Sequence, residues 1–121
     1  MIQTFTSDHA AATTEFGTLT QRLIPWAGQA DQPPFGQMAL FLDAHAETEP
    51  DCHDQDEFVI VLCGRAEVRM DGESVRISRG EMAFLPRNHR HVIVNPGDDR
   101  LVWLSIYWPL HEPTGGEREG E

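Results

Sequence analysis

Residues 57–78 read EFVIVLCGRAEVRMDGESVRIS, and this stretch decides the fold. It begins with a run of β-branched residues, which favour strands. Polar and apolar residues alternate along 66–70 and again along 73–78, so each segment has one face for a core and one for solvent. Asp71 and Gly72 separate the two segments, and this dipeptide is a strong signal for a tight hairpin. The stretch therefore predicts successive short strands joined by turns.

The same pattern continues on both sides of this stretch. Further strand-like segments lie at 18–26, 37–42, 82–85, 91–94 and 101–108. Turn residues rather than crossover helices separate them, which favours an all-β sandwich or barrel. A chain of 121 residues has room for one domain. We expect an N-terminal arm over 1–17, the barrel over 18–111 and a flexible acidic tail over 112–121.

Composition restricts the classes of partner. The formal net charge is −11, from 9 basic and 20 acidic residues, and the chain has no lysine. We therefore expect no nucleic-acid partner and no membrane partner, because both need concentrated positive charge. Two cysteines, Cys52 and Cys63, make no disulfide framework, and the N-terminus lacks a signal-peptide pattern, so the cytoplasm is the expected location. Strand parity places Cys63 inside, as a buried thiol.

Two histidines and a carboxylate mark the candidate site. His53 and Glu57 are four residues apart, which puts both side chains on one face of an extended chain. Residues 80–95, GEMAFLPRNHRHVIVN, form a strand, a turn and a returning strand that begins at His91. Imidazole and carboxylate together are ligands for a divalent cation.

These motifs resemble those of the cupins, a family of antiparallel β jelly-roll barrels. The first cupin motif is G-x5-H-x-H-x(3,4)-E-x6-G, and its second half is matched by His53, Glu57 and Gly64. The second motif is G-x5-P-x-G-x2-H-x3-N. It is matched at every spacing by Gly80, Pro86, His91 and Asn95. Asn88 replaces its internal glycine, and asparagine also tolerates a left-handed turn.

The resemblance implies that His53, Glu57 and His91 bind a metal, and it leaves a fourth ligand open. Asp51 replaces the first histidine of the H-x-H pair, and His45 replaces the opening glycine. Asp51, His45 or water could fill the fourth position. With water, a two-histidine, one-carboxylate site suits non-haem Fe(II), although Mn, Ni and Zn use the same ligand types.

A second, partial resemblance concerns coordination. The D-x-H…E…P-x-N-x2-H pattern is similar to that of 3-hydroxyanthranilate dioxygenases, a cupin group whose His, Glu and His hold iron. That group has a longer gap between its histidine and glutamate, and a longer chain. The similarity implies a ligand set and no substrate.

Four further residues are candidates for the substrate pocket. Trp103 and Tyr107 share one face of the last strand with Ser105. Arg22 could hold a substrate carboxylate if it points inward. His89 lies in the turn before His91, where it could contact the substrate or support a ligand.

These features predict a metal-dependent cupin acting on a small polar metabolite by dioxygenase or isomerase chemistry. Glu57 and His91 are the candidate catalytic residues, with Glu57 as ligand or base. A non-catalytic module that binds or senses a small molecule is the alternative, followed by a purely structural role. Pairing through an exposed edge strand predicts a homodimer.

Overall fold

The structure is a computed structural model, and it describes residues 2–24 and 33–109. These residues form one 3-10 helix and nine strands. The elements are η1 (His9–Ala11), β1 (Thr13–Glu15), β2 (Thr18–Ile24), β3 (Gly36–Leu42), β4 (Asp56–Cys63), β5 (Arg65–Met70), β6 (Glu73–Ser78), β7 (Met82–Leu85), β8 (His91–Val94) and β9 (Leu101–Trp108). The predicted tail, and the last two residues of the strand predicted over 18–26, lie outside the described residues.

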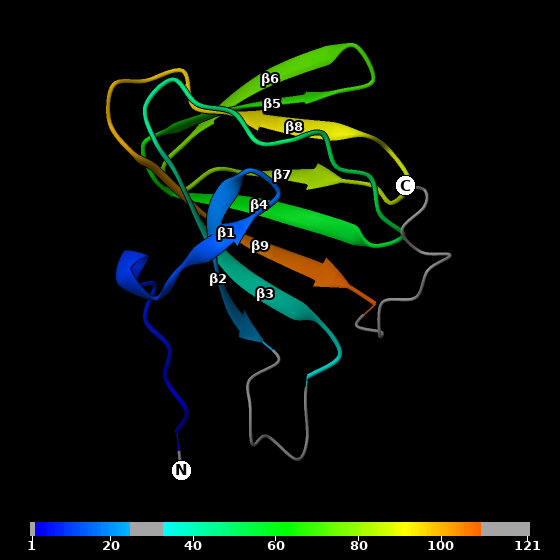
Figure 1. Ribbon diagram of the computed structural model, residues 1–121. Coiled ribbons are helices and arrows are strands. Elements are labelled where there is room, and N and C mark those ends of the chain that lie inside the picture. Colours follow the sequence, from blue (N-terminus) through cyan, green and yellow to red (C-terminus); the bar gives the residue numbers. More distant parts are fainter. Residues whose placement is uncertain (1, 25–32, 110–121) are drawn as a thin grey trace.

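The strands form two sheets that face each other, as Figure 1 shows. The larger sheet has the order β1-β2-β3-β9-β4-β7, and the smaller has the order β6-β5-β8. Every pairing between named strands is antiparallel. The prediction of an all-β antiparallel barrel is therefore confirmed.

The main core lies between the two sheets. Both sheets contribute alternate residues to it, as the period of a strand requires. The most deeply buried of its large side chains are Val59, Val61, Leu85, Leu101 and Trp103. Burial of such side chains is the main favourable contribution to folding.

The N-terminal segment is more ordered than the predicted arm. Residues 13–15 form β1, which pairs with β2 across a turn made by Phe16 and Gly17. Both turn residues have positive φ, 55° and 75°, as a type I′ turn requires. A side chain at Gly17 would also approach Glu49 Cγ to 2.9 Å. Glycine at this position therefore allows the hairpin to lie close to the segment before β4.

That segment, residues 46–51, runs along β8. Thr48 N donates to Ile93 O at 2.9 Å, and Asp51 and His91 form an antiparallel bridge. Asn95, which is fully buried, extends this connection because its side-chain amide donates to the carbonyl oxygens of Leu42, Asp43 and Asp99. The motif asparagine thus ties the end of β3 to the turn before β9.

Two predictions about side-chain direction are wrong. Cys63 is exposed rather than buried, because the pairing of β4 with β9 shifts register between Val61 and Cys63 and the shift breaks strand parity. Val75, which alternation directs inward, is 43% exposed. It lies on β6, an edge strand whose one partner among the described strands is β5. In the part of the chain that the structure describes, no helix could span a bilayer.

Candidate metal centre

Glu57 is the carboxylate at the centre of the site. It lies on β4, between its register partners Leu85 on β7 and Tyr107 on β9, and only 7% of its surface is exposed. Its Oε1 lies 3.2 Å from His53 Nε2 and 3.7 Å from His91 Nε2. The three residues implied by the motif resemblance therefore meet at one carboxylate oxygen.

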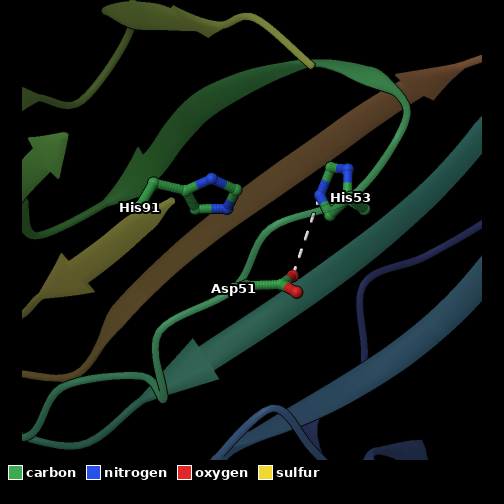
Figure 2. A group of neighbouring side chains, drawn as sticks. All are labelled: Asp51, His53 and His91. Atoms are coloured by element: carbon green, nitrogen blue, oxygen red, sulfur yellow. Dashed lines mark ion pairs between the residues drawn. The ribbon is translucent and has the colours of Figure 1, made fainter. Parts of the chain in front are cut away.

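Asp51 joins this group through the backbone. Asp51 N donates to His91 O at 3.0 Å, and His91 N donates to Asp51 O at 2.9 Å, so the two residues are direct cross-strand partners. Asp51 Oδ2 lies 3.7 Å from His53 Nε2. One ligand atom from each of Asp51, His53 and His91 lies within 4.8 Å of the others. Figure 2 shows the three side chains converging from the segment before β4 and from the start of β8.

The charges in this cluster are strongly coupled. Burial alone would raise the pKa of Glu57, but the hydrogen bond from His53, the charges of both histidines and the Ser105 hydroxyl outweigh it and hold that pKa below its usual value. Burial lowers the pKa of His53, whereas Glu57 and Asp51 raise it by more, and the net shift is upward. The cluster therefore favours the ionised form of the Glu57 carboxyl group and the protonated form of the His53 ring.

Further groups hold these side chains in place. The Ser105 hydroxyl donates a hydrogen bond to Glu57 Oε2, which leaves Oε1 facing the histidines. His91 Nδ1 lies 3.3 Å from His89 O, and Asn88 N donates to His53 O at 2.8 Å. Such contacts orient metal ligands and raise the basicity of imidazole.

The donor set fits a divalent cation. Two imidazoles and two carboxylates meet in a mostly buried place, and the nitrogen and oxygen donors suit Fe, Mn, Ni or Zn. His53 Nε2 lies 3.2 Å from Glu57 Oε1 and 3.7 Å from Asp51 Oδ2, so this ring nitrogen is the one that faces both carboxylates. His53, His91, Glu57 and Asp51 are thus the residues that could hold a metal.

A cavity of about 100 Å³ adjoins the cluster. Its lining includes three of the predicted pocket residues, Arg22, Trp103 and Tyr107. The remaining described lining residues are Phe16, Thr18, Met38, Leu40, Thr48, Glu49, Asp51, His53, Gln55, Glu57, His91 and Ile93. The site is therefore a partly enclosed pocket with the ligand cluster in its wall.

Two candidate residues lie elsewhere. His45 is not a fourth ligand: its side chain is 64% exposed and pairs with Asp98 at 2.7 Å. Its φ of 62° shows that it fills the left-handed turn position of the motif glycine. His89 does not line the cavity, because its ring pairs with Asp71 at 2.5 Å on the exposed surface. Asn88, with φ 67°, takes the left-handed conformation expected of it.

Sequence reasoning missed the contribution of the N-terminal hairpin. Phe16 lines the cavity, and Glu15 pairs with Arg22, although both lie in the predicted arm. Glu49 also lines the cavity from the segment beside β8. The Phe-Gly turn lacks the usual Asn-Gly or Asp-Gly signal, although its glycine and the short polar segment before it could have indicated a hairpin.

Comparisons with known proteins place this chain by family and by fold. A curated relative, endoribonuclease YbeY of Myxococcus xanthus (strain DK1622), is 28% identical over 106 residues. The match covers 86% of this chain and 29% of that protein, so the chain spans less than a third of the length of the curated relative it matches.

Solved structures share the whole barrel. A Cupin 2 conserved barrel domain protein of Salinispora arenicola CNS-205 is similar at a TM-score of 0.78, with 26% identity and 89% of each chain covered. The plu4264 protein of Photorhabdus luminescens matches at 0.78, with 23% identity over 89% of this chain and 88% of that one. KdgF of Halomonas sp. matches at 0.66, with 23% identity over 82% and 86%.

The family model of the cupin domain, Cupin_2, matches residues 40–107. This range contains both sequence motifs and all four residues that could hold a metal, and it covers more than half of the chain. The chain therefore belongs to the cupin family.

Proposed function

We propose that this protein is a metal-dependent enzyme that acts on a small polar metabolite inside the barrel. The observation that carries the proposal is the convergence of Asp51, His53, Glu57 and His91 on one place in the wall of a cavity. The segment before β4, strand β4 itself and the start of β8 supply these side chains. A buried carboxylate between two imidazoles is costly unless a positive charge balances it.

A divalent cation held there would polarise a substrate oxygen or, as iron, activate dioxygen. The chain's own residues would do the rest. His53 and His91 would offer neutral ring nitrogens, and Glu57 would ligate through Oε1 or accept a proton there. Ser105 holds the other oxygen of Glu57, and Met38, Leu40 and Trp103 form apolar walls that limit water near the reacting atoms.

The reaction class follows from the ion. Dioxygenase chemistry is the proposal for iron, and isomerase chemistry is the proposal for Mn, Ni or Zn. Cleavage of RNA is not proposed, although the Myxococcus xanthus relative is named an endoribonuclease. The match covers 29% of that protein, and a net charge of −11 opposes binding to a phosphate backbone.

Elemental analysis tests the proposal. The purified protein should hold one equivalent of Fe, Mn, Ni or Zn, and a His53→Ala His91→Ala variant should hold none. His45→Ala is the matched control, because this histidine lies outside the cluster, and it should retain the metal. A protein that takes up no metal after loading with each of the four ions would overturn the proposal and favour the non-catalytic binding module.

Oxygen consumption separates the two reaction classes. The iron-loaded protein should consume dioxygen with a catechol or an aminophenol if it is a dioxygenase. Absence of uptake would contradict that branch and favour isomerase chemistry.

We also propose a cytoplasmic homodimer with a small-molecule ligand and no nucleic-acid or membrane partner. Light scattering measures the dimer directly, and a monomeric mass at micromolar concentration would contradict it.

A further inference from the structure

Arg22 connects the cavity with the protein surface. It lies on β2, lines the cavity, and has a side chain that is 46% exposed. Its Nη1 donates to the Tyr107 hydroxyl at 3.1 Å. Tyr107 is the register partner of Glu57 on the neighbouring strand. Tyr107 therefore lies between the candidate metal ligands and the guanidinium of Arg22.

A carboxylate of the protein itself, that of Glu15, is already bound to this guanidinium. Glu15 Oε1 lies 2.6 Å from Arg22 Nη2, and Glu15 Oε2 lies 3.2 Å from Arg22 Nε. This is the bidentate arrangement by which arginine recognises carboxylates. Glu15 belongs to β1, a three-residue strand at the edge of the sheet, so little backbone pairing holds it there.

Three uncharged polar side chains of the cavity wall are engaged with the backbone. The Thr18 hydroxyl donates to Phe41 O, Thr48 Oγ1 accepts from Ile93 N, and Gln55 Nε2 donates to Pro109 O. Among the described lining residues, Arg22 alone carries a permanent positive charge. In a chain with net charge −11, this guanidinium is the place where the pocket can attract an anion.

Tyr107 adds a second donor. A guanidinium only donates hydrogen bonds, so the phenol accepts from Arg22 and keeps its own hydrogen for another acceptor. Burial raises the pKa of Tyr107 although Arg22 opposes the shift, so the hydroxyl stays protonated at neutral pH. The hydroxyl and the guanidinium therefore present donors at one end of the cavity, with the ligand cluster also in its wall.

We infer that Arg22 and Tyr107 form the binding site for a carboxylate group of the substrate, and that Glu15 occupies this site until the substrate displaces it. The inference rests on the proposed function and names its substrate class. The substrate is a small carboxylic acid with a further oxygen group that reaches the metal cluster. Both ends must fit a cavity of about 100 Å³.

The test uses propionate and its neutral analogue propionamide, titrated into the metal-free full-length protein and followed by NMR chemical shifts. Propionate should shift the signals of Arg22 and Tyr107. Arg22→Gln should weaken propionate binding roughly tenfold or more, because a charge-assisted hydrogen bond is lost. Arg22→Lys keeps the positive charge but loses the bidentate geometry of the guanidinium. Its propionate affinity should lie between those of the unaltered protein and Arg22→Gln. Propionamide should bind equally weakly to all three proteins.

Glu15→Gln distinguishes displacement from a general charge effect. It should tighten propionate binding several-fold, whereas Glu49→Gln, which removes a like charge from the same wall, should have a smaller effect. Equal gains in both variants would overturn the inference, and so would unchanged propionate affinity in a folded Arg22→Gln protein. Circular dichroism establishes folding.

The result stands apart from the test of metal binding. Arg22→Gln should bind Mn²⁺ as the unaltered protein does, because Arg22 is not among the cluster residues. Propionate binding at Arg22 without any metal uptake would contradict the proposed enzyme and retain the carboxylate site. Metal uptake together with propionate binding that does not depend on Arg22 would contradict the carboxylate site and retain the proposed enzyme.

Discussion

Ser105 donates a hydrogen bond to Glu57 from the neighbouring strand, and this contact fixes which carboxylate oxygen faces His53 and His91. Ser105 is fully buried on β9, so its hydroxyl has no role at the surface. The pairing of a buried hydroxyl with a buried carboxylate shows how the sheet interior orients the central carboxylate of the candidate site.

The first prediction concerns this contact. Ser105→Ala removes the donor at little change in volume, and Glu57 then loses its fixed orientation. Mn²⁺ affinity, measured by electron paramagnetic resonance, should fall roughly tenfold, as is typical when a group that supports a metal ligand is lost. Ser74→Ala is the control, because Ser74 donates to Glu67 on the exposed side of the small sheet. Equal affinity in both variants would show that Ser105 does not support the site.

Gly36 is predicted to be required for the position of Tyr107. A Cβ at residue 36 would lie 2.2 Å from Tyr107 Cζ, so the ring would have to move. Gly36→Ala should cost about 1–3 kcal/mol of unfolding free energy, measured in urea, as overpacking usually does. In a Tyr107→Leu background the same substitution should cost clearly less. Equal costs in both backgrounds would mean that the ring is not the obstacle.

Asn95 is predicted to contribute to stability rather than to chemistry. Its amide nitrogen donates to three carbonyl oxygens, and its Oδ1 accepts from Gly97 N at 3.0 Å. Asn95→Ala leaves these buried groups without partners and should cost about 3 kcal/mol of unfolding free energy. Asn95→Asp keeps the size and the contact with Gly97 but lacks the donors, so it should be destabilised as well. An Asp variant as stable as the unaltered protein would contradict this role.

A further prediction gives the stability a pH dependence. Three hydrogen bonds, from Arg69, Ser74 and Arg76, lower the pKa of Glu67. They outweigh the opposite effect of desolvation and hold this pKa below its ordinary value of 4.5. A lowered pKa contributes stability above the unfolded value, and this contribution is lost as the pH falls through the folded pKa. Glu67→Gln should therefore lower stability at pH 7 and have less effect in acid.

Urea unfolding at pH 7 and near pH 3 measures this change. Glu73→Gln on the neighbouring strand is the control, because in the described part of the chain the ion pairs with Arg69 and Arg76 belong to Glu67. A stability difference for Glu67→Gln that is the same at both pH values would rule out the ionic explanation.

Much of the site followed from local spacing. His53 and Glu57 share a face because strand side chains alternate, and His91 begins a strand because a turn precedes it, so the motif spacing led to the cluster. The pairing of Asp51 with His91 was not predictable, because it depends on a segment between two strands that lies along β8. Long-range pairing of this kind leaves no periodic signal in either segment.

The errors have equally physical causes. Cys63 lies beyond a register shift, so alternation counted from Val61 no longer gives its direction. His89 and His45 carry ligand-type rings, but nearby aspartates hold both rings at the surface. The role of Glu15 depends on a hairpin whose turn, Phe16-Gly17, has an unusual first residue.

The antiparallel bridge between Asp51 and His91 bears on how the sequence of this pocket can vary. Three of the four residues proposed to hold an ion, Asp51, Glu57 and His91, belong to paired backbone, whereas Glu15 and Phe16 belong to a short edge hairpin. Under the proposed function, exchanges in that hairpin would alter what enters the pocket and leave the proposed coordinating groups in place. Selectivity and coordination would then be separable within one barrel.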